Sequence, residues 1–248
     1  LCQKNTKNSM KLSLGFSSCP NDTFIFEAIV NKRIDTEGLD FEVIIKDIQD
    51  LNVMVQKTKL DVSKLSYNAF ASCIDKYNLM KCGSALGNKC GPILISKPNI
   101  SLDSQSQVAL PGPLTTASML FDIFFPNFQN KKHILFSEIE NEVISGNVDA
   151  GVIIHENRFT YEKNGLFKVA DLGEMWEEKT KLPIPLGGIA VSRVLPKKIK
   201  MSIERVVRKS IDYAFENPHI SVKYIKRYAQ ELDEHITVSY THLRAHET

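Results

Sequence analysis

One corner sets the expected fold class: Leu12-Ser-Leu-Gly-Phe-Ser-Ser-Cys-Pro-Asn-Asp-Thr-Phe-Ile-Phe26 reads as a buried strand, a tight polar turn and the first turn of a helix. Asn21 or Asp22 can cap this helix by accepting hydrogen bonds from free backbone N–H groups, and Pro20 disfavours a longer helix at that end. In open α/β sheets, ligands bind where a helix begins beyond the carboxyl end of a strand, since unpaired amides point outward there. The corner therefore predicts an α/β protein, in which this turn is either an ordinary capped corner or part of a ligand site.

Short apolar runs alternate with helical patterns along the rest of the chain, which favours an α/β fold with mainly parallel sheets. The run 148–154 is apolar apart from Asp149, as expected for a strand that is buried on both faces. The expected strands are 11–16, 39–45, 61–64, 79–81, 92–96, 107–110, 133–136, 148–154, 166–172 and 187–192. The expected helices are 22–31, 48–56, 66–77, 116–125, 139–145, 201–217 and 218–230.

Two α/β lobes joined by crossing strands near 92–96 and 187–192 suit this layout. We expect the first lobe to comprise residues 10–96 and 190–238, and the second to comprise 97–189. Residues 1–9 and 239–248 are expected to be non-native extensions. Met10 directly precedes the first strand and fits a true start, and 239–248 resembles a translated sequencing adapter, with a genuine polar tail as the alternative.

The composition limits the classes of function. Of the 248 residues, 43% are hydrophobic and 24% are charged, as in an ordinary globular protein. A formal net charge of +2 gives no electrostatic reason to expect nucleic acid or a membrane as a partner. The five cysteines form no CxxC pair or zinc spacing, so we expect reduced thiols and no metal site. No apolar run approaches the roughly 20 residues that span a bilayer, and we expect a cytoplasmic protein.

Polar residues follow the end of a strand at four places. After the opening corner come Val62-Ser-Lys-Leu-Ser-Tyr67, Leu110-Pro-Gly-Pro-Leu-Thr-Thr-Ala117 and Val152-Ile-Ile-His-Glu-Asn-Arg-Phe159. Ser66 is a good N-cap for the helix expected after the second turn, and Thr115 or Thr116 for the helix after the third. Each cap alone is most simply structural. If the strands are parallel, however, the four turns face one cleft, and together they predict a ligand site.

His155 is the residue best suited to proton transfer. It directly follows the apolar run 151–154, which would hold it at the edge of a sheet. Histidine suits acid–base work because its unperturbed pKa, about 6.5, lies near neutral pH. Glu156 and Asn157 could fix its tautomer, and Arg158 could pair with Glu156 or with a substrate carboxylate. The simpler alternative is a solvent-exposed or hydrogen-bonded histidine without a catalytic role.

Several motifs, in chain order, resemble one family. The opening corner is similar to Gly-Phe-Ser-Pro-Cys-Pro-Asn-Asp-Thr-Phe, with Ser18 in place of the first proline, and His155-Glu-Asn-Arg-Phe-Thr-Tyr161 is similar to His-Glu-Ser/Asn-Arg-Phe-Thr-Tyr. Both patterns are typical of 1,4-dihydroxy-6-naphthoate synthases, enzymes of the futalosine route to menaquinone. The resemblance spans about Met10 to Asp233 and includes Gly83-Ser-Ala-Leu-Gly87, Asp171-Leu-Gly-Glu-Met-Trp-Glu-Glu-Lys-Thr180 and Leu182-Pro-Ile-Pro-Leu-Gly-Gly188.

The resemblance implies a type II periplasmic-binding-protein fold, with two α/β lobes around a central cleft. It implies a carbon–carbon lyase that converts cyclic dehypoxanthine futalosine to 1,4-dihydroxy-6-naphthoate without a metal or organic cofactor. His155 would then be the catalytic base. The residues expected to bind or line the substrate site are Lys64, Leu65, Ser66, Thr116, Ala117, Cys19, Asn21 and Asp22.

Two alternatives remain at this point. Chorismate dehydratase, the sister family of the same pathway, shares the fold and acts on a related acid, but the Ser-Cys-Pro-Asn-Asp-Thr and His-Glu-Asn-Arg motifs favour the synthase. A non-catalytic solute-binding protein would carry an export signal, which is not seen, and would not need a histidine at the cleft. The sequence also contains no P-loop, GxGxxG or Gly-x-Ser-x-Gly motif.

Overall fold

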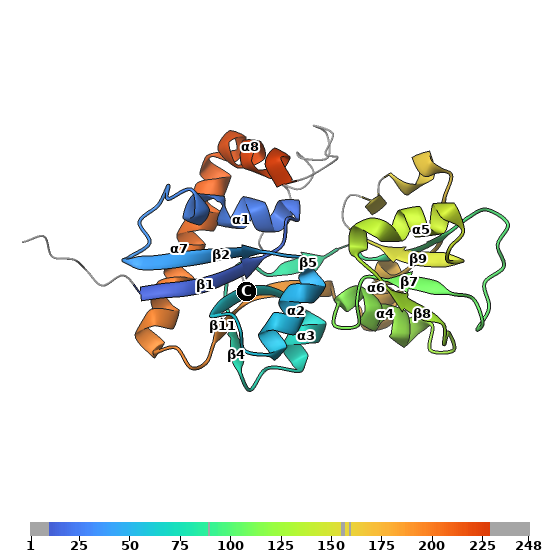
Figure 1. The fold of residues 1–248 in the computed structure, drawn as a ribbon, viewed down its shortest axis with the longest axis horizontal. Helices are drawn as coiled ribbons and strands as arrows, with labels where there is room; N and C mark the ends of the chain where they lie inside the picture. The colour runs from blue at the N-terminus through green and yellow to red at the C-terminus, as the bar shows by residue number, and fades with distance from the viewer. Residues whose placement is uncertain (1–9, 89, 155–156, 159, 229–248) are drawn as a thin grey trace, which may run out of the picture.

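The computed structural model describes residues 10–88, 90–154, 157–158 and 160–228, with side chains as far as residue 225. The chain forms two α/β bodies that lie side by side, each built around its own sheet (Figure 1). Within these ranges, no helix is both long enough and apolar enough to cross a bilayer.

The first sheet has the strand order β2-β1-β3-β11-β4, and β5 also pairs with β11. Its strands are β1 (Met10–Phe16), β2 (Leu39–Ile45), β3 (Val62–Ser66), β4 (Tyr77–Leu79), β5 (Ala85–Gly87) and β11 (Ile184–Ser192). β1 runs parallel to β2 and β3, whereas β11 runs antiparallel to β3, β4 and β5. The carboxyl ends of β1 and β3 therefore lie at the same edge of the sheet.

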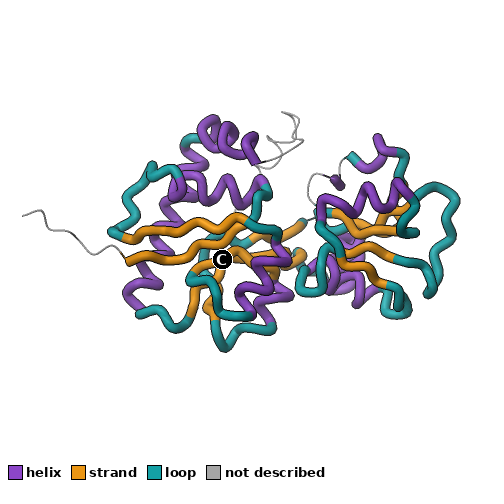
Figure 2. Tube along the Cα trace, viewed as in Figure 1, coloured by secondary structure: helices purple, strands orange, loops and turns teal. Residues whose placement is uncertain are grey.

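Helices cover both faces of the first sheet (Figure 2). They are α1 (Pro20–Val30), α2 (Ile48–Gln56), α3 (Tyr67–Ala71), α7 (Lys197–Glu216) and α8 (Pro218–Tyr228). Alternate residues of β1, Leu12, Leu14 and Phe16, share a core with α1 and α7. Gly15 faces the opposite way, where a Cβ would come within 2.9 Å of Leu51 in α2. The two-residue period of the strand thus gives the sheet a hydrophobic core on each face.

The second sheet has the order β10-β6-β9-β7-β8. Its strands are β6 (Ile93–Ser96), β7 (Val108–Leu110), β8 (Lys131–His133), β9 (Ala150–Ile153) and β10 (Phe167–Asp171). β7 runs parallel to β8 and β9, whereas β6 runs antiparallel to β9 and β10. The carboxyl ends of β7 and β9 therefore lie at one edge, as those of β1 and β3 do in the first sheet.

The second sheet is also covered on both faces. Its helices are α4 (Thr116–Phe124), α5 (Ile139–Ser145) and α6 (Leu172–Thr180), with 3-10 turns η1 (Phe136–Glu138) and η3 (Tyr161–Asn164). Ile93 and Ile95 of β6 pack with α5 and Tyr161, whereas Leu94 packs with α4 and α6. Each body therefore has its own pair of cores.

Two segments join the bodies. β11 carries Ile184 in a core of the second body and Ile189 and Val191 in a core of the first, as expected for a crossing strand. The other segment leads from the end of β5 to the start of β6. β6 hydrogen-bonds within the second sheet. We therefore propose that the first boundary between the lobes lies before β6, not after residue 96, and that the second lies within β11, near the expected residue 189. Residues 1–9 and 239–248 lie outside the described residues.

Most expected elements are present within a few residues of their expected bounds, and 39–45, 48–56 and 139–145 agree residue for residue. Both sheets, however, are mixed instead of mainly parallel, because the crossing strands β6 and β11 enter them in the antiparallel direction. The strand expected at 133–136 is at 131–133, and the segment after it forms η1.

The long helix expected over 66–77 is wrong. α3 ends at Ala71, and the Cys73 carbonyl accepts hydrogen bonds from the amides of Lys76 and Tyr77, both at 3.0 Å. This turn returns the chain into β4, where the Tyr77 hydroxyl donates to the Leu60 carbonyl at 2.6 Å. The buried tyrosine thus fixes a strand where helical periodicity alone favoured more helix. β5 and α6 were not expected from the sequence.

Candidate active site

The opening corner forms, but its helix is capped differently from the prediction. α1 begins at Pro20, which occupies a first-turn position where a missing N–H costs no hydrogen bond. Cys19 is the N-cap, so the prediction that Asn21 or Asp22 caps the helix is wrong. The Asp22 carboxylate turns inward instead, where one oxygen accepts hydrogen bonds from the Ser17 amide at 3.1 Å and the Ser17 hydroxyl at 2.7 Å.

A buried ion pair ties this corner to β3. The other carboxylate oxygen of Asp22 accepts a hydrogen bond from Lys64 Nζ at 2.7 Å, and the two side chains are 3% and 7% exposed. An ammonium group carries three N–H donors. Among the residues that the structure describes, Asp22 is the one acceptor of a hydrogen bond from this ammonium. As far as the described residues go, two of its donors are therefore available to an incoming oxygen atom, whereas both oxygens of Asp22 are occupied.

Ser66 occupies the N-cap position of α3, as the sequence predicts, but its side chain does not cap the helix. Asn52 of α2 binds it on both sides: the Ser66 amide donates to Asn52 Oδ1 at 2.9 Å, and Asn52 Nδ2 donates to the Ser66 hydroxyl at 3.1 Å. Leu65, the residue before it, has a fully buried side chain in the core beneath α2. At Leu65, only the backbone can face the edge of the sheet.

The third turn caps α4 as predicted. Thr115 Oγ1 accepts a hydrogen bond from the Ser118 amide at 3.2 Å and donates to the Gly112 carbonyl at 2.8 Å. Thr116 directs its hydroxyl to the Leu186 carbonyl of β11 at 2.9 Å. Ala117 is buried in the core under α4. The side chains of Thr116 and Ala117 are thus used within the protein, which leaves their backbone amides at the start of the helix.

This turn is braced against the first body. The Gln49 side chain of α2 accepts from the Leu114 amide at 3.1 Å, and Asn52 donates to the Leu114 carbonyl at 3.3 Å. Asn68 of α3 donates to the Thr115 carbonyl at 3.2 Å. Gln49 and Asn52 are three residues apart and so share one face of α2. This spacing could have been seen in the sequence as two polar residues on one helix face. The neighbouring sequence does not show, however, that their partners lie some 60 residues further along the chain.

The fourth turn is described in part. His155 and Glu156 lie outside the described residues, whereas Asn157 and Arg158 are described. Arg158 donates to the Gly91 carbonyl at 2.7 Å and to the Asp171 carboxylate, whereas the expected pairing with Glu156 falls on a residue outside the described part of the chain. Asn157 donates to the Glu140 carboxylate. Asp171 and Glu140 were not expected as site residues.

Shifted pKa values and possible metal ligands say little about what this edge of the sheets binds. Burial, together with the hydrogen bond to Glu162, raises the pKa of Tyr161 above its ordinary value. Within the described part of the chain, no three side chains of His, Cys, Asp or Glu are placed to hold a metal ion. The described groups at this edge that could meet a ligand are hydrogen-bond donors: the Lys64 ammonium and the backbone amides at helix starts.

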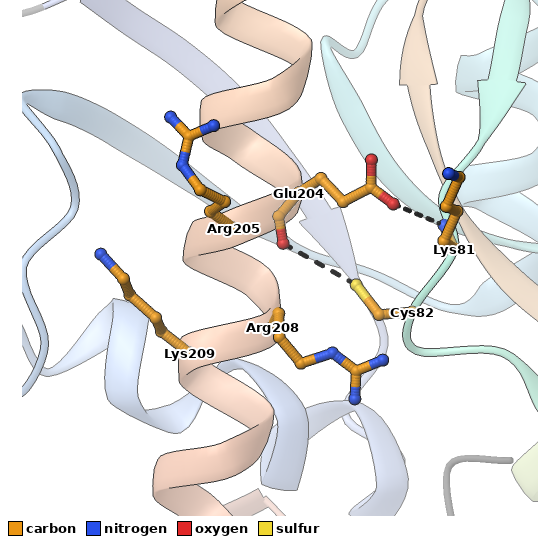
Figure 3. Close-up of a pocket in the computed structure, with 6 residues that line it drawn as sticks. All are labelled: Lys81, Cys82, Glu204, Arg205, Arg208 and Lys209. Atoms are coloured by element: carbon orange, nitrogen blue, oxygen red, sulfur yellow. Dashed lines mark hydrogen bonds between the residues drawn. The ribbon is translucent and has the colours of Figure 1, made fainter. Parts of the chain in front are cut away.

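A cavity of about 360 Å³ lies elsewhere, beside α7 (Figure 3). Its lining includes Cys82, whose thiol has its pKa raised by burial to about 11. Two of its cations, Arg205 and Lys209, already pair with Glu37 at 2.6 and 3.0 Å. None of the expected site residues lines this cavity, so we do not take it as the active site.

Comparison with known proteins decides the family. A family model described as menaquinone biosynthesis matches residues 12–246. The chain belongs to the menaquinone biosynthesis family. Two relatives in the family are named 1,4-dihydroxy-6-naphthoate synthase. The one from Thermus thermophilus is 38% identical over 231 residues, which cover 93% of this chain and 84% of the relative. The one from Streptomyces coelicolor is 39% identical over 228 residues, which cover 90% and 80%. This member of the family is therefore an enzyme of menaquinone biosynthesis.

Solved structures confirm the expected fold. A crystal structure of a protein from Archaeoglobus fulgidus matches with a TM-score of 0.90 and 33% identity, covering 97% of this chain and 90% of that one. The periplasmic aliphatic sulphonate-binding protein of Escherichia coli matches with a TM-score of 0.65 at 12% identity, covering 95% and 84%. At that identity the likeness shows the fold alone, which is the periplasmic-binding-protein fold.

Proposed function

We propose that this enzyme is a carbon–carbon lyase that converts cyclic dehypoxanthine futalosine to 1,4-dihydroxy-6-naphthoate in the cytoplasm, without a metal or organic cofactor. The observation that carries the proposal is its identity of 38–39% to two synthases of that name over at least 80% of their length. The site geometry supports it, because the strand ends present donors suited to an acidic, oxygen-rich substrate. Membership of a fold with many functions would not be sufficient alone.

The proposed catalytic base is His155. Its support is the family-like segment 155–161 and its place in the sequence two residues after the end of the buried strand β9. In this mechanism His155 removes a proton from a hydroxyl of the sugar-derived part of the bicyclic substrate, and that oxygen becomes a carbonyl as the carbon–carbon bond breaks. The electron pair of the broken bond passes to the new ring, which becomes aromatic, and the sugar-derived fragment leaves as the second product. A well-placed base contributes about 10²–10⁴ in rate, so binding and exclusion of water must supply the rest.

Helix starts support the binding role proposed for Thr116 and Ala117. The first amides of an α-helix have no acceptor within the helix, and the helix dipole favours negative charge there. In α4 the Ser118 and Met119 amides are bonded to Thr115, so the two preceding amides, of Thr116 and Ala117, are the ones that an oxygen atom of the substrate would meet.

The same argument applies at α1. The Thr23 amide donates to the Cys19 carbonyl at 3.0 Å, which leaves the amides of Asn21 and Asp22 as the first donors of that helix. We therefore assign Asn21 and Asp22 to the site through their backbones, with Cys19 lining it.

Lys64 is the cation proposed to meet the substrate carboxylate, which the naphthoate product retains. Asp22 takes one of the three donors of the Lys64 ammonium, and no other described residue takes either of the remaining two. Leu65 and Ser66 would complete this wall through their backbone, because the Leu65 side chain is in the core and the Ser66 hydroxyl already accepts from Asn52.

The test is turnover of cyclic dehypoxanthine futalosine, with 1,4-dihydroxy-6-naphthoate measured by chromatography, for the unmodified chain and for His155→Asn and Lys64→Met. We expect product from the unmodified chain, a loss of at least about 10²-fold in kcat for His155→Asn, and a raised KM for Lys64→Met.

Three results would contradict parts of the proposal. Binding without product would indicate a solute-binding protein, and dehydration of chorismate instead would indicate the sister enzyme. Full kcat in His155→Asn would remove His155 as the base and leave the overall reaction standing.

A further inference from the structure

Arg158 joins three parts of the second body. Its guanidinium donates to the Gly91 carbonyl, in the segment that crosses between the bodies, at 2.7 Å. It also donates to the carboxylate of Asp171, where β10 ends and α6 begins. The Arg158 side chain is 14% exposed and that of Asp171 is 2% exposed. The segment after β9, the crossing segment and the start of α6 therefore meet at one buried side chain.

Asp171 serves both partners at once. One carboxylate oxygen accepts from Arg158, while the other accepts from the amides of Gly173 and Glu174 at 3.0 and 3.1 Å, which caps α6. Gly91 and Gly173 allow this arrangement, because a Cβ on Gly91 would lie 2.6 Å from the Gly173 Cα. The two backbones therefore lie close together where the guanidinium donates to both the Gly91 carbonyl and Asp171.

A second carboxylate holds the same segment from the other side. Glu140, in the first turn of α5, is 7% exposed. Its two oxygens accept from the side-chain amides of Asn157 and of Asn164, the latter at 2.7 Å. Tyr161 between them is buried in the core with α5. Asn157 and Asn164 are thus both tied to one carboxylate, and Arg158 is tied to another.

We infer that Arg158, together with Asp171 and Glu140, forms a set of positioning residues that holds the chain at Asn157 and Arg158, next to the proposed base in sequence, and that Arg158 does not bind the substrate. The inference rests on the proposed function, in which His155 acts as that base. Asn157 and Arg158 follow His155 by two and three residues in sequence, so the contacts that hold them act on the chain next to the proposed base. A guanidinium with planar, fixed donors suits two partners at once, whereas an ammonium would reach them less well.

Asp171→Asn is the sharpest perturbation. Asparagine caps helices about as well as aspartate, so α6 keeps its cap while the charge that holds Arg158 is removed. The matched control is Asp149→Asn in the same body, since Asp149 also accepts a backbone amide, that of Gln107 at 2.7 Å, but does not contact Arg158. Thermal unfolding of both variants checks that the fold is kept.

The kinetic readout separates positioning from binding. We expect kcat for Asp171→Asn to fall about 10- to 100-fold, because a misplacement near 1 Å costs about 10² in rate, while KM stays within about threefold. Asp149→Asn should match the unmodified chain. Arg158→Lys keeps the positive charge, so its kcat should lie between that of Asp171→Asn and that of Asp149→Asn. Unchanged kcat in Asp171→Asn would overturn the inference, as would a raised KM at full kcat, which would make Arg158 a substrate-binding residue.

A second readout does not depend on turnover. With ¹³C-labelled histidine in the full chain, the signal lost in His155→Asn identifies His155. We expect that signal to shift in Asp171→Asn and to stay in Asp149→Asn, and an unmoved signal would overturn the inference. If the unmodified chain made no product, the proposed function would fail, whereas the histidine signal would still decide the positioning. If Asp171→Asn did not fold, Arg158→Lys would decide by the same two measurements.

Discussion

The buried pair between Asp22 and Lys64 allows a quantitative test of how the first wall of the site is built. The perturbation is Asp22→Asn, which keeps an oxygen to accept the hydrogen bonds from Ser17 but removes the negative charge 2.7 Å from Lys64 Nζ. Both side chains are at least nine-tenths buried, so the ammonium would be left without a counter-charge in a poorly solvated place. Breaking such a pair from one side costs about 3–5 kcal/mol.

The assay is urea unfolding followed by circular dichroism, with the double variant Asp22→Asn/Lys64→Met completing a cycle. We expect Asp22→Asn to lower the free energy of unfolding by about 3–5 kcal/mol and the double variant to recover part of that loss, since no unpaired charge remains. The control is Glu42→Gln. The side chains of Glu42 and of its partner Lys11 are 58% and 66% exposed, so removing this pair should leave the free energy of unfolding almost unchanged. A loss below about 1 kcal/mol for Asp22→Asn, or no coupling between the two substitutions, would show that Lys64 does not depend on Asp22 as its counter-charge.

Two further predictions follow from particular residues. Gly112 has a φ of +116°, and a Cβ there would lie 2.5 Å from Gln49, so Gly112→Ala should cost about 1–3 kcal/mol in urea unfolding and weaken substrate binding. An unchanged unfolding midpoint would contradict this. Hydrogen bonds from Arg205 and Lys209 lower the pKa of Glu37 from 4.5 to about 2. A lowered folded-state pKa stabilises the fold above the unfolded value and loses that contribution as the pH falls from about 4.5 to about 2. In Glu37→Gln, Tm should therefore fall less steeply between pH 5 and pH 2 than in the unmodified chain. An equal slope of Tm against pH in both would show that the ion pair does not stabilise the fold.

Local signals made much of the fold predictable. Pro20 and Thr115 act within their own turn, since one suits the start of a helix and the other caps it. The apolar spacing of 48–56 and 139–145 marked two helices to the residue. Such signals depend on neighbours within about one turn, and a single sequence contains them.

The parts that could not be predicted depend on residues distant in the chain. Asp22 looks like a cap from sequence, but Lys64, 42 residues away, takes its carboxylate instead. Asp171 and Arg158 are 13 residues apart, a separation with no periodic signature. The direction of β11 follows from the crossing between the bodies, which apolar runs do not encode. Sequence therefore predicted where the turns are, and tertiary packing decides what their side chains contact.

Conversion of cyclic dehypoxanthine futalosine by the purified chain, followed by mass spectrometry, tests the proposed reaction itself. We expect one 1,4-dihydroxy-6-naphthoate to form for each substrate consumed, in the presence of a metal chelator, and conversion to be lost in His155→Asn. Binding of the substrate with no naphthoate formed would contradict the proposed reaction.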